Sequence, residues 1–226
     1  MIVQDLSAVE ISQYLTTTGL SFRAGSFTVN VHSDIATVAS GISTLYGESE
    51  IITKSCDFNI SLEKSPGLRK YIKPQVQFYL NGIEPFSPLP FSQALPLLEW
   101  GLNWCVTNYC HEYLIIHAAV VEKNGFALIL PGQPGAGKST LCAALVEVGG
   151  WRLLSDELTI AQLDGERIQP NPRPTSLKNQ SIEVVKSFTC AKRFTPTVHD
   201  TLKGSVAHLK PLSNSISQFN KPAIPA

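Results

Sequence analysis

The sequence predicts an α/β fold with a mixed sheet, preceded by an α+β N-terminal part. Three observations support this prediction: a glycine-rich loop between a strand-like run and a helical stretch, an antiparallel hairpin leading into that loop, and alternating strand patterns early in the chain. With 226 residues, of which 43% are hydrophobic, the chain is long enough to bury a substantial core.

Composition narrows the functional classes. The 18 Lys and Arg residues balance 18 Asp and Glu residues, so nothing indicates a nucleic-acid-binding surface. Charged and amide side chains interrupt the apolar zone 95–121, which excludes a lipid-spanning helix, and the first residues lack the features of a signal peptide. The five irregularly spaced cysteines predict reduced, mostly buried thiols in a cytoplasmic protein rather than disulfides or a zinc site.

A proline-rich bend divides the predicted elements into a first part, 1–85, and a second part, 86–226. Period-two alternation predicts strands in the first part, and Asp34 is a candidate N-cap for a helix there. Apolar residues on one face predict a helix at the start of the second part. The predicted strands are 26–32, 57–62 and 75–80, and the predicted helices are 35–45 and 91–109.

A hairpin is predicted immediately before the glycine-rich loop. Asn124-Gly125 stands between apolar runs over 114–121 and 126–130, and Asn-Gly at such a place is typical of a two-residue turn. That turn pairs Lys123 with Phe126. A connection this short makes the strand before the loop an antiparallel neighbour, which is unusual for a nucleotide-binding α/β protein.

The hairpin register positions one histidine. Extending the pairing places His117 opposite Gly132, the first glycine of the loop. A lone histidine on a buried strand is ordinarily a core residue, whereas a histidine beside such a loop can touch a nucleotide or its reacting phosphate. Both interpretations stay open.

The loop itself fits the pattern G-x-x-x-x-G-K-[ST] without a mismatch. Its backbone N–H groups would surround phosphate, Lys138 would neutralise the β- and γ-phosphates, and Ser139 would ligate Mg²⁺. The loop therefore predicts binding of ATP and Mg²⁺, against the alternative of a surface turn that matches by chance. The expected nucleotide-binding residues here are Gly132, Gln133, Pro134, Gly135, Ala136, Gly137, Lys138, Ser139 and Thr140.

A helix over 139–148 follows the loop and ends at Gly149-Gly150. An inward apolar stripe is predicted for it, formed by Leu141, Ala144, Leu145 and Val148. A right-handed crossover then places a short strand, 151–155, parallel to the strand before the loop.

Two carboxylates follow that strand, so they emerge at the edge of the sheet where the loop lies. One of Asp156 and Glu157 would hold Mg²⁺ and the other would accept the proton of an attacking hydroxyl or orient a water. The sequence does not order these roles. The alternative is a solvated charge pair at the end of a strand.

The combination resembles the bacterial HPr kinase/phosphorylase family, whose core reads roughly H-G-x-x-V, the glycine loop, and L-x-x-R-G-H-x-L-x-A-D-D. It is most similar to the group called HPr kinase-related kinase A, whose nucleotide core resembles that of phosphoenolpyruvate carboxykinase. The segments that carry the resemblance are His117–Val121, Gly132–Thr140, Leu145–Glu157, Pro172–Asn179 and Asp200–Leu209.

The resemblance implies a mixed-sheet P-loop core and a kinase that transfers the γ-phosphoryl group of ATP, with Mg²⁺, to a hydroxyl, most readily serine, of a protein or peptide. It implies Asp156 as the base, Lys138 and Ser139 as phosphate and metal ligands, and His117 on the phosphate side. By analogy it also implies self-association. Glu157 replaces the family's second aspartate, and a C-terminal family motif has no counterpart, which implies a core that ends early.

Three further cations and two further functions remain open. Arg173 lies between two prolines and, like Lys178 and Lys203, is a candidate contact for the γ-phosphate or the substrate; a solvent-facing basic loop is the alternative. His199 and His208 are expected to be surface or structural residues. The alternative functions are a P-loop ATPase and a non-catalytic nucleotide-binding regulatory protein.

Overall fold

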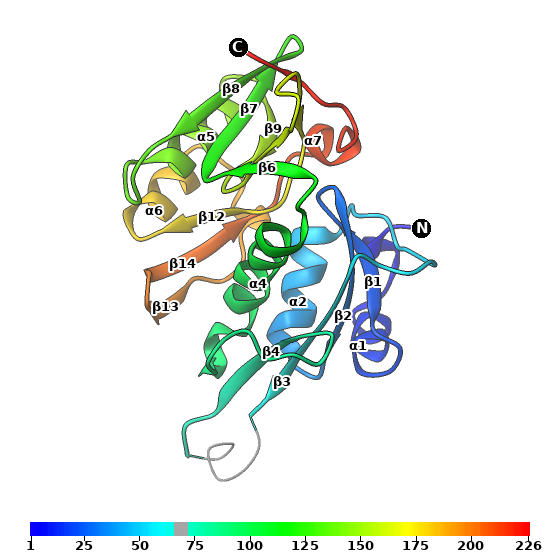
Figure 1. Ribbon diagram of the computed structural model, residues 1–226. Helices are drawn as coiled ribbons and strands as arrows, with labels where there is room; N and C mark the ends of the chain where they lie inside the picture. Colours follow the sequence, from blue (N-terminus) through cyan, green and yellow to red (C-terminus); the bar gives the residue numbers. More distant parts are fainter. Residues whose placement is uncertain (66–71) are drawn as a thin grey trace. The chain divides into compact units, whose positions relative to one another are not determined.

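The computed structural model describes residues 1–65 and 72–226 (Figure 1). The described part is a mixed α/β protein with six α-helices and four sheets, which confirms the α/β prediction at that level. The chain forms two compact units, Met1–Cys105 and Val106–Ala226.

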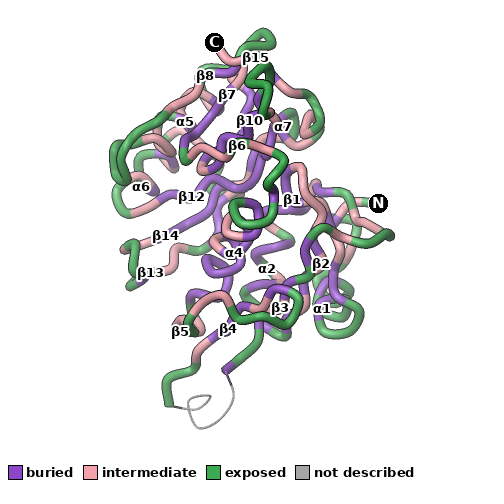
Figure 2. Tube along the Cα trace, viewed as in Figure 1, coloured by how far each residue is buried: buried purple, intermediate pink, exposed green. Residues whose placement is uncertain are grey.

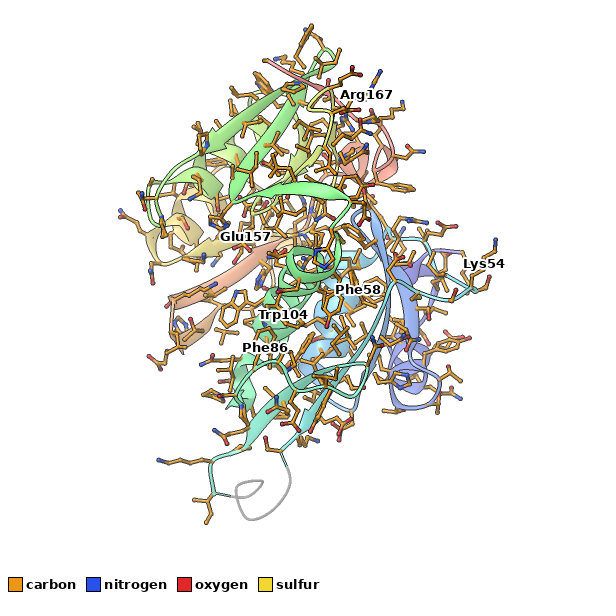
Figure 3. All side chains as sticks on the ribbon, in the orientation of Figure 1. Lys54, Phe58, Phe86, Trp104, Glu157 and Arg167 are labelled. Atoms are coloured by element: carbon orange, nitrogen blue, oxygen red, sulfur yellow. The ribbon has the colours of Figure 1, made fainter. Side chains whose placement is uncertain are left out.

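The units divide later in the chain than the predicted boundary after residue 85. Aromatic contacts tie the intervening residues to the first unit: the Phe86 ring lies 5.4 Å from Phe78 and 5.4 Å from Trp104 (Figure 3). Gly101 allows this approach, because a Cβ there would meet the Phe78 ring at 2.1 Å. The helix that carries Gly101 and Trp104 therefore packs on the first sheet.

The first unit is a five-stranded sheet in the order β1-β2-β3-β4-β5, in which only β2 and β3 run parallel. The crossover between those two strands contains α2. The predicted strands and helices are present, each within a few residues. The elements are α1 (Ala8–Thr16), β1 (Leu20–Ala24), β2 (Phe27–Ser33), α2 (Ala36–Tyr46), β3 (Phe58–Lys64), β4 (Gln75–Leu80), β5 (Leu89–Pro90) and α4 (Ala94–Tyr109), which continues across the division.

The second unit contains three sheets, ordered β15-β8-β7-β9, β11-β10-β6 and β12-β14-β13. Its strands are β6 (Tyr113–Ile116), β7 (Ala118–Lys123), β8 (Phe126–Pro131), β9 (Arg152–Ser155), β10 (Thr159–Gln162), β11 (Ile168–Gln169), β12 (Thr175–Lys178), β13 (Val198–Thr201), β14 (Gly204–Leu209) and β15 (Ile224–Pro225). Its helices are α5 (Lys138–Glu147), α6 (Gln180–Lys186) and α7 (Ser213–Ser217).

The β7–β8 hairpin has the predicted register, with Lys123 opposite Phe126. Both turn residues take the left-handed conformation that such a turn requires, with φ of 56° at Asn124 and 88° at Gly125. The predicted single strand over 114–121 is wrong, however. It breaks at His117 into β6, which pairs with β10, and β7, which pairs with β8 and β9.

The predicted direction of β9 is confirmed. Both β8 and β9 run antiparallel to β7, which lies between them, so β8 and β9 are parallel to each other. The carboxyl ends of both strands therefore reach the same edge of the sheet. That edge carries the glycine-rich loop after β8 and the Asp156–Glu157 pair after β9.

Helix α5 is buried differently from the prediction. Leu141 and Val148 are 50% and 70% exposed, whereas Cys142, Ala143 and Val146 are buried. Cys142 and Val146 pack against β7 and β9, while Ala143 packs on the opposite side against β12, β14 and α6. Because α5 is covered by two sheets, small residues at adjacent positions face the core, and one apolar stripe does not describe it.

The central strands are buried, whereas the loop before α5 is exposed (Figure 2). Among the described residues, no helix is long and apolar enough to cross a membrane. Three of the five cysteines, Cys105, Cys110 and Cys142, are buried, in line with the predicted buried thiols.

Candidate functional site

The glycine loop, residues Gly132–Thr140, runs from the end of β8 into the first turn of α5, and its glycines allow the curved backbone. Gly135 and Gly137 have φ of 84° and 86°, a conformation that side-chain-bearing residues rarely adopt. Gly137 is the residue directly before α5, so the loop delivers its N–H groups at the positive end of the helix dipole. The Lys138 ammonium donates to the Gly132 carbonyl at 2.6 Å and to the Gln133 carbonyl at 3.2 Å.

A pocket of about 770 Å³ opens beside this loop, within the size range of ligand sites. One wall is the loop and the first turn of α5. The other wall comes from the β12-β14-β13 sheet and α6. The lining residues are His117, Pro134, Gly135, Gly137, Lys138, Ser139, Thr140, Asp156, Glu157, Ser176, Lys178, Asn179, Gln180, Ser181, Val184 and Lys203.

Asp156 lies at the base of the pocket and is only 5% exposed. Its Oδ2 accepts a hydrogen bond from the Ser176 backbone N–H at 3.1 Å, and its Oδ1 is buried without a hydrogen-bond partner of good geometry in the described residues. Burial and the neighbouring Glu157 charge raise the pKa of Asp156 to about 7, although the Ser139 hydroxyl and the Ser176 amide favour the charged form.

Glu157 contacts a lysine of the β12-β14-β13 sheet. Its carboxylate lies 3.8 Å from the Lys178 ammonium, and its side chain is 19% exposed (Figure 3 labels Glu157). The charge of Glu157 also acts on the pKa values of Lys203 and His208, so these groups form one electrostatic cluster. The two adjacent carboxylates thus have different surroundings, a distinction that the sequence did not provide.

The residues present fit a magnesium ion bound together with a nucleotide. The described residues contain no cluster of three His, Cys, Asp or Glu side chains suited to hold a metal alone. Mg²⁺ at a glycine loop of this kind needs few protein ligands, because phosphate oxygens and waters complete its shell. The Ser139 hydroxyl would supply an oxygen ligand, and the buried Oδ1 of Asp156 would accept a hydrogen bond from a water in the magnesium shell.

The structure brings together most of the predicted site residues. His117 is exposed at the end of β7 and lines the pocket with the glycine loop, although strand pairing stops one residue short of it. Arg173 is 6% exposed and does not line the pocket, so it is not on a solvent-facing loop. Its charge nevertheless reaches His208.

Sequence reasoning gave no role to Ser176 or His208. They are cross-strand partners on β12 and β14, and burial lowers the pKa of His208 to about 4, with the nearby cations acting in the same direction against Glu157. The Ser176 backbone supports Asp156. The pairing of β12 with β14 brings these two residues together, and the sequence pattern of neither strand indicates it.

Comparison of the whole chain with models of protein families, with curated proteins and with solved structures gave no match.

Lys138 gives a direct test of the loop. Lys138→Met should weaken MgATP binding by about ten- to a hundredfold, because a charge-assisted contact to phosphate is lost. Titration calorimetry with the full chain measures this. The exposed Lys192→Met is the matched control and should bind as the parent does. Equal affinity in Lys138→Met would argue against phosphate binding at the loop.

Proposed function

We propose that this protein is an ATP- and Mg²⁺-dependent phosphotransferase that acts on a hydroxyl, most readily serine, of a protein or peptide. One observation carries the proposal: a buried carboxyl group, Asp156, with its pKa raised to about 7, stands in the same pocket as a glycine loop that carries a lysine and a serine. A pKa near the working pH suits a general base.

Each residue has a defined task in the proposed reaction. The loop amides and Lys138 hold the triphosphate, and Mg²⁺, when bound with the nucleotide at Ser139, would supply positive charge to the phosphate oxygens. The acceptor oxygen forms a bond to the γ-phosphorus while the bond to the β–γ bridging oxygen breaks, and ADP leaves. The hydroxyl proton passes to Asp156. His117, which lines the same pocket, would contact the phosphates.

The motif resemblance to HPr kinase-related proteins supports the same reaction class. The ATPase alternative requires Glu157 to polarise water, but the Glu157 carboxylate lies 3.8 Å from the Lys178 ammonium. Among the described residues, Asp156 retains a buried oxygen without a hydrogen-bond partner. These contacts favour transfer with Asp156 as the base.

The test is incubation of the full chain with γ-labelled ATP, Mg²⁺ and serine-containing peptides. Labelled peptide supports the proposal. Free labelled phosphate with no labelled peptide would instead support the ATPase. Tight nucleotide binding with neither product would instead support the regulatory protein.

The raised pKa of Asp156 predicts the pH dependence of transfer. A base must be deprotonated, so the rate at subsaturating substrate should be constant above about pH 7 and fall about tenfold per pH unit below it. Initial rates from pH 5 to 9 measure the profile. A flat profile down to pH 5 would mean that Asp156 is not the base.

A further inference from the structure

Two lysines lie on the pocket wall opposite the glycine loop, and the proposed nucleotide contacts do not use them. Lys178 ends β12, and Lys203 lies in the turn between β13 and β14. Both line the pocket, and Glu157 is the carboxylate that interacts with both. The triphosphate already has the loop amides and Lys138 on the facing wall.

The turn that presents Lys203 is fixed in place. Asn179, the residue after Lys178, accepts a hydrogen bond from the Ser205 N–H at 3.0 Å and donates to the Lys203 carbonyl at 3.5 Å. Gly204 allows this contact, because a Cβ there would lie 2.2 Å from the Asn179 Oδ1. The backbones that carry both lysines are therefore joined, and such preorganisation lowers the entropy lost on binding.

The charged residues that line the pocket favour the binding of an anion. Among the charged side chains that line the pocket are three lysines, Lys138, Lys178 and Lys203, and two carboxylates, Asp156 and Glu157. Burial lowers the pKa of Lys203 more than the Glu157 charge raises it, and the Lys178 charge lowers it further, so an added carboxylate would stabilise its charged form.

The rest of the wall suits a peptide. Gln180 and Ser181 offer amide and hydroxyl groups, and Val184, which is 42% exposed, offers an apolar contact. Such mixed hydrogen-bonding and apolar groups match a peptide chain rather than a second polyphosphate.

We infer that Lys178 and Lys203 form a recognition site for a carboxylate of the acceptor, so that the phosphorylated hydroxyl lies in an acidic segment of a protein or peptide. The inference rests on the proposed function, because it specifies the acceptor of that transfer. It gives the Glu157 carboxylate a task, which is to hold the two ammonium groups in position until the acceptor's carboxylate binds.

The test uses fluorescent serine peptides of one sequence with glutamate, alanine or lysine at the flanking positions. Anisotropy measures their binding to the full chain with a non-hydrolysable ATP analogue and Mg²⁺, and transfer is measured separately with γ-labelled ATP. The glutamate-flanked peptide should bind at least about tenfold more tightly than the lysine-flanked one, with a preference that weakens as salt is added.

Variants identify the residues responsible. Lys203→Gln and Lys178→Gln should each reduce the preference for the glutamate-flanked peptide about tenfold while MgATP affinity changes less, and Lys203→Glu should shift binding toward the lysine-flanked peptide. The exposed Lys192→Gln should change neither quantity. The charge-reversal variant keeps the test valid if a neutral substitution disturbs the turn.

The outcomes separate the two proposals. Selective binding of the acidic peptide that depends on Lys178 and Lys203, without transfer, would support the recognition site and count against the kinase. Transfer with equal use of all three peptides would overturn the recognition site alone. Loss of MgATP affinity larger than loss of peptide affinity in these variants would also overturn it, because the lysines would then belong to the nucleotide.

Discussion

Replacing Asp156 with asparagine should reduce phosphoryl transfer by about a thousandfold. Asparagine keeps the side-chain shape and can still accept from the Ser176 amide, but it cannot take a proton from the acceptor. Affinity for the nucleotide should fall much less, because the loop amides and Lys138 remain. Initial rates of peptide labelling and calorimetric titration with MgATP measure the two effects.

The same substitution should stabilise the fold, which a purely structural residue would not show. The folded pKa of about 7 lies above the ordinary value of 3.8, so below about pH 4 the carboxyl is protonated in both states and contributes no penalty. As pH rises toward 7 the unfolded chain ionises first, and the folded protein loses stability relative to Asp156→Asn.

Above pH 7 the variant should therefore be more stable by a few kcal/mol, since each pKa unit corresponds to about 1.4 kcal/mol. Urea unfolding at pH 4 and pH 8 measures the difference. Asp164→Asn, an exposed control in the β10–β11 turn, should leave transfer and stability unchanged. Retained transfer in Asp156→Asn, or equal destabilisation at both pH values, would remove Asp156 from the role of base.

Part of this candidate site could be predicted from local sequence patterns. Asn124-Gly125 determines the hairpin register, the glycine loop carries its own signature, and a short crossover returns the chain beside it at Asp156. In each case the deciding interaction spans few residues, so the sequence pattern contains it.

The rest of the site depends on pairings between distant segments. The β12–β14 sheet brings Ser176 and Lys178 to the pocket, and nothing in either strand's own pattern places them beside Asp156. The same sheet covers the second side of α5, which is why its predicted apolar stripe is wrong. The break of the strand at His117 likewise follows from β6 pairing with β10 in a different sheet.

Arg152 should have the largest effect on stability of any single residue on the sheet that carries the loop. Its guanidinium, 7% exposed, pairs with Glu122 at 2.7 Å and donates to the carbonyls of Gln218 at 3.0 Å and Lys221 at 2.9 Å. Burial opposes ionisation of Glu122, but the hydrogen bonds from Arg152 and from the Gly125 N–H at 2.6 Å lower its pKa overall. Arg152 thus ties β9 both to the hairpin and to the C-terminal segment.

Arg152→Met should therefore lower the free energy of unfolding by about 3 kcal/mol, because the half-buried Glu122 carboxylate loses its ionic partner and two carbonyls lose their donors. Proteolysis should cut the segment 213–226 faster, since β15 pairs with β8 through only two residues. Adding Glu122→Gln should recover part of the lost free energy of unfolding, because it removes the carboxylate charge that has lost its ionic partner. If the double variant were as unstable as the sum of its two single changes, Arg152 would act through packing of its aliphatic stem rather than through this ionic contact.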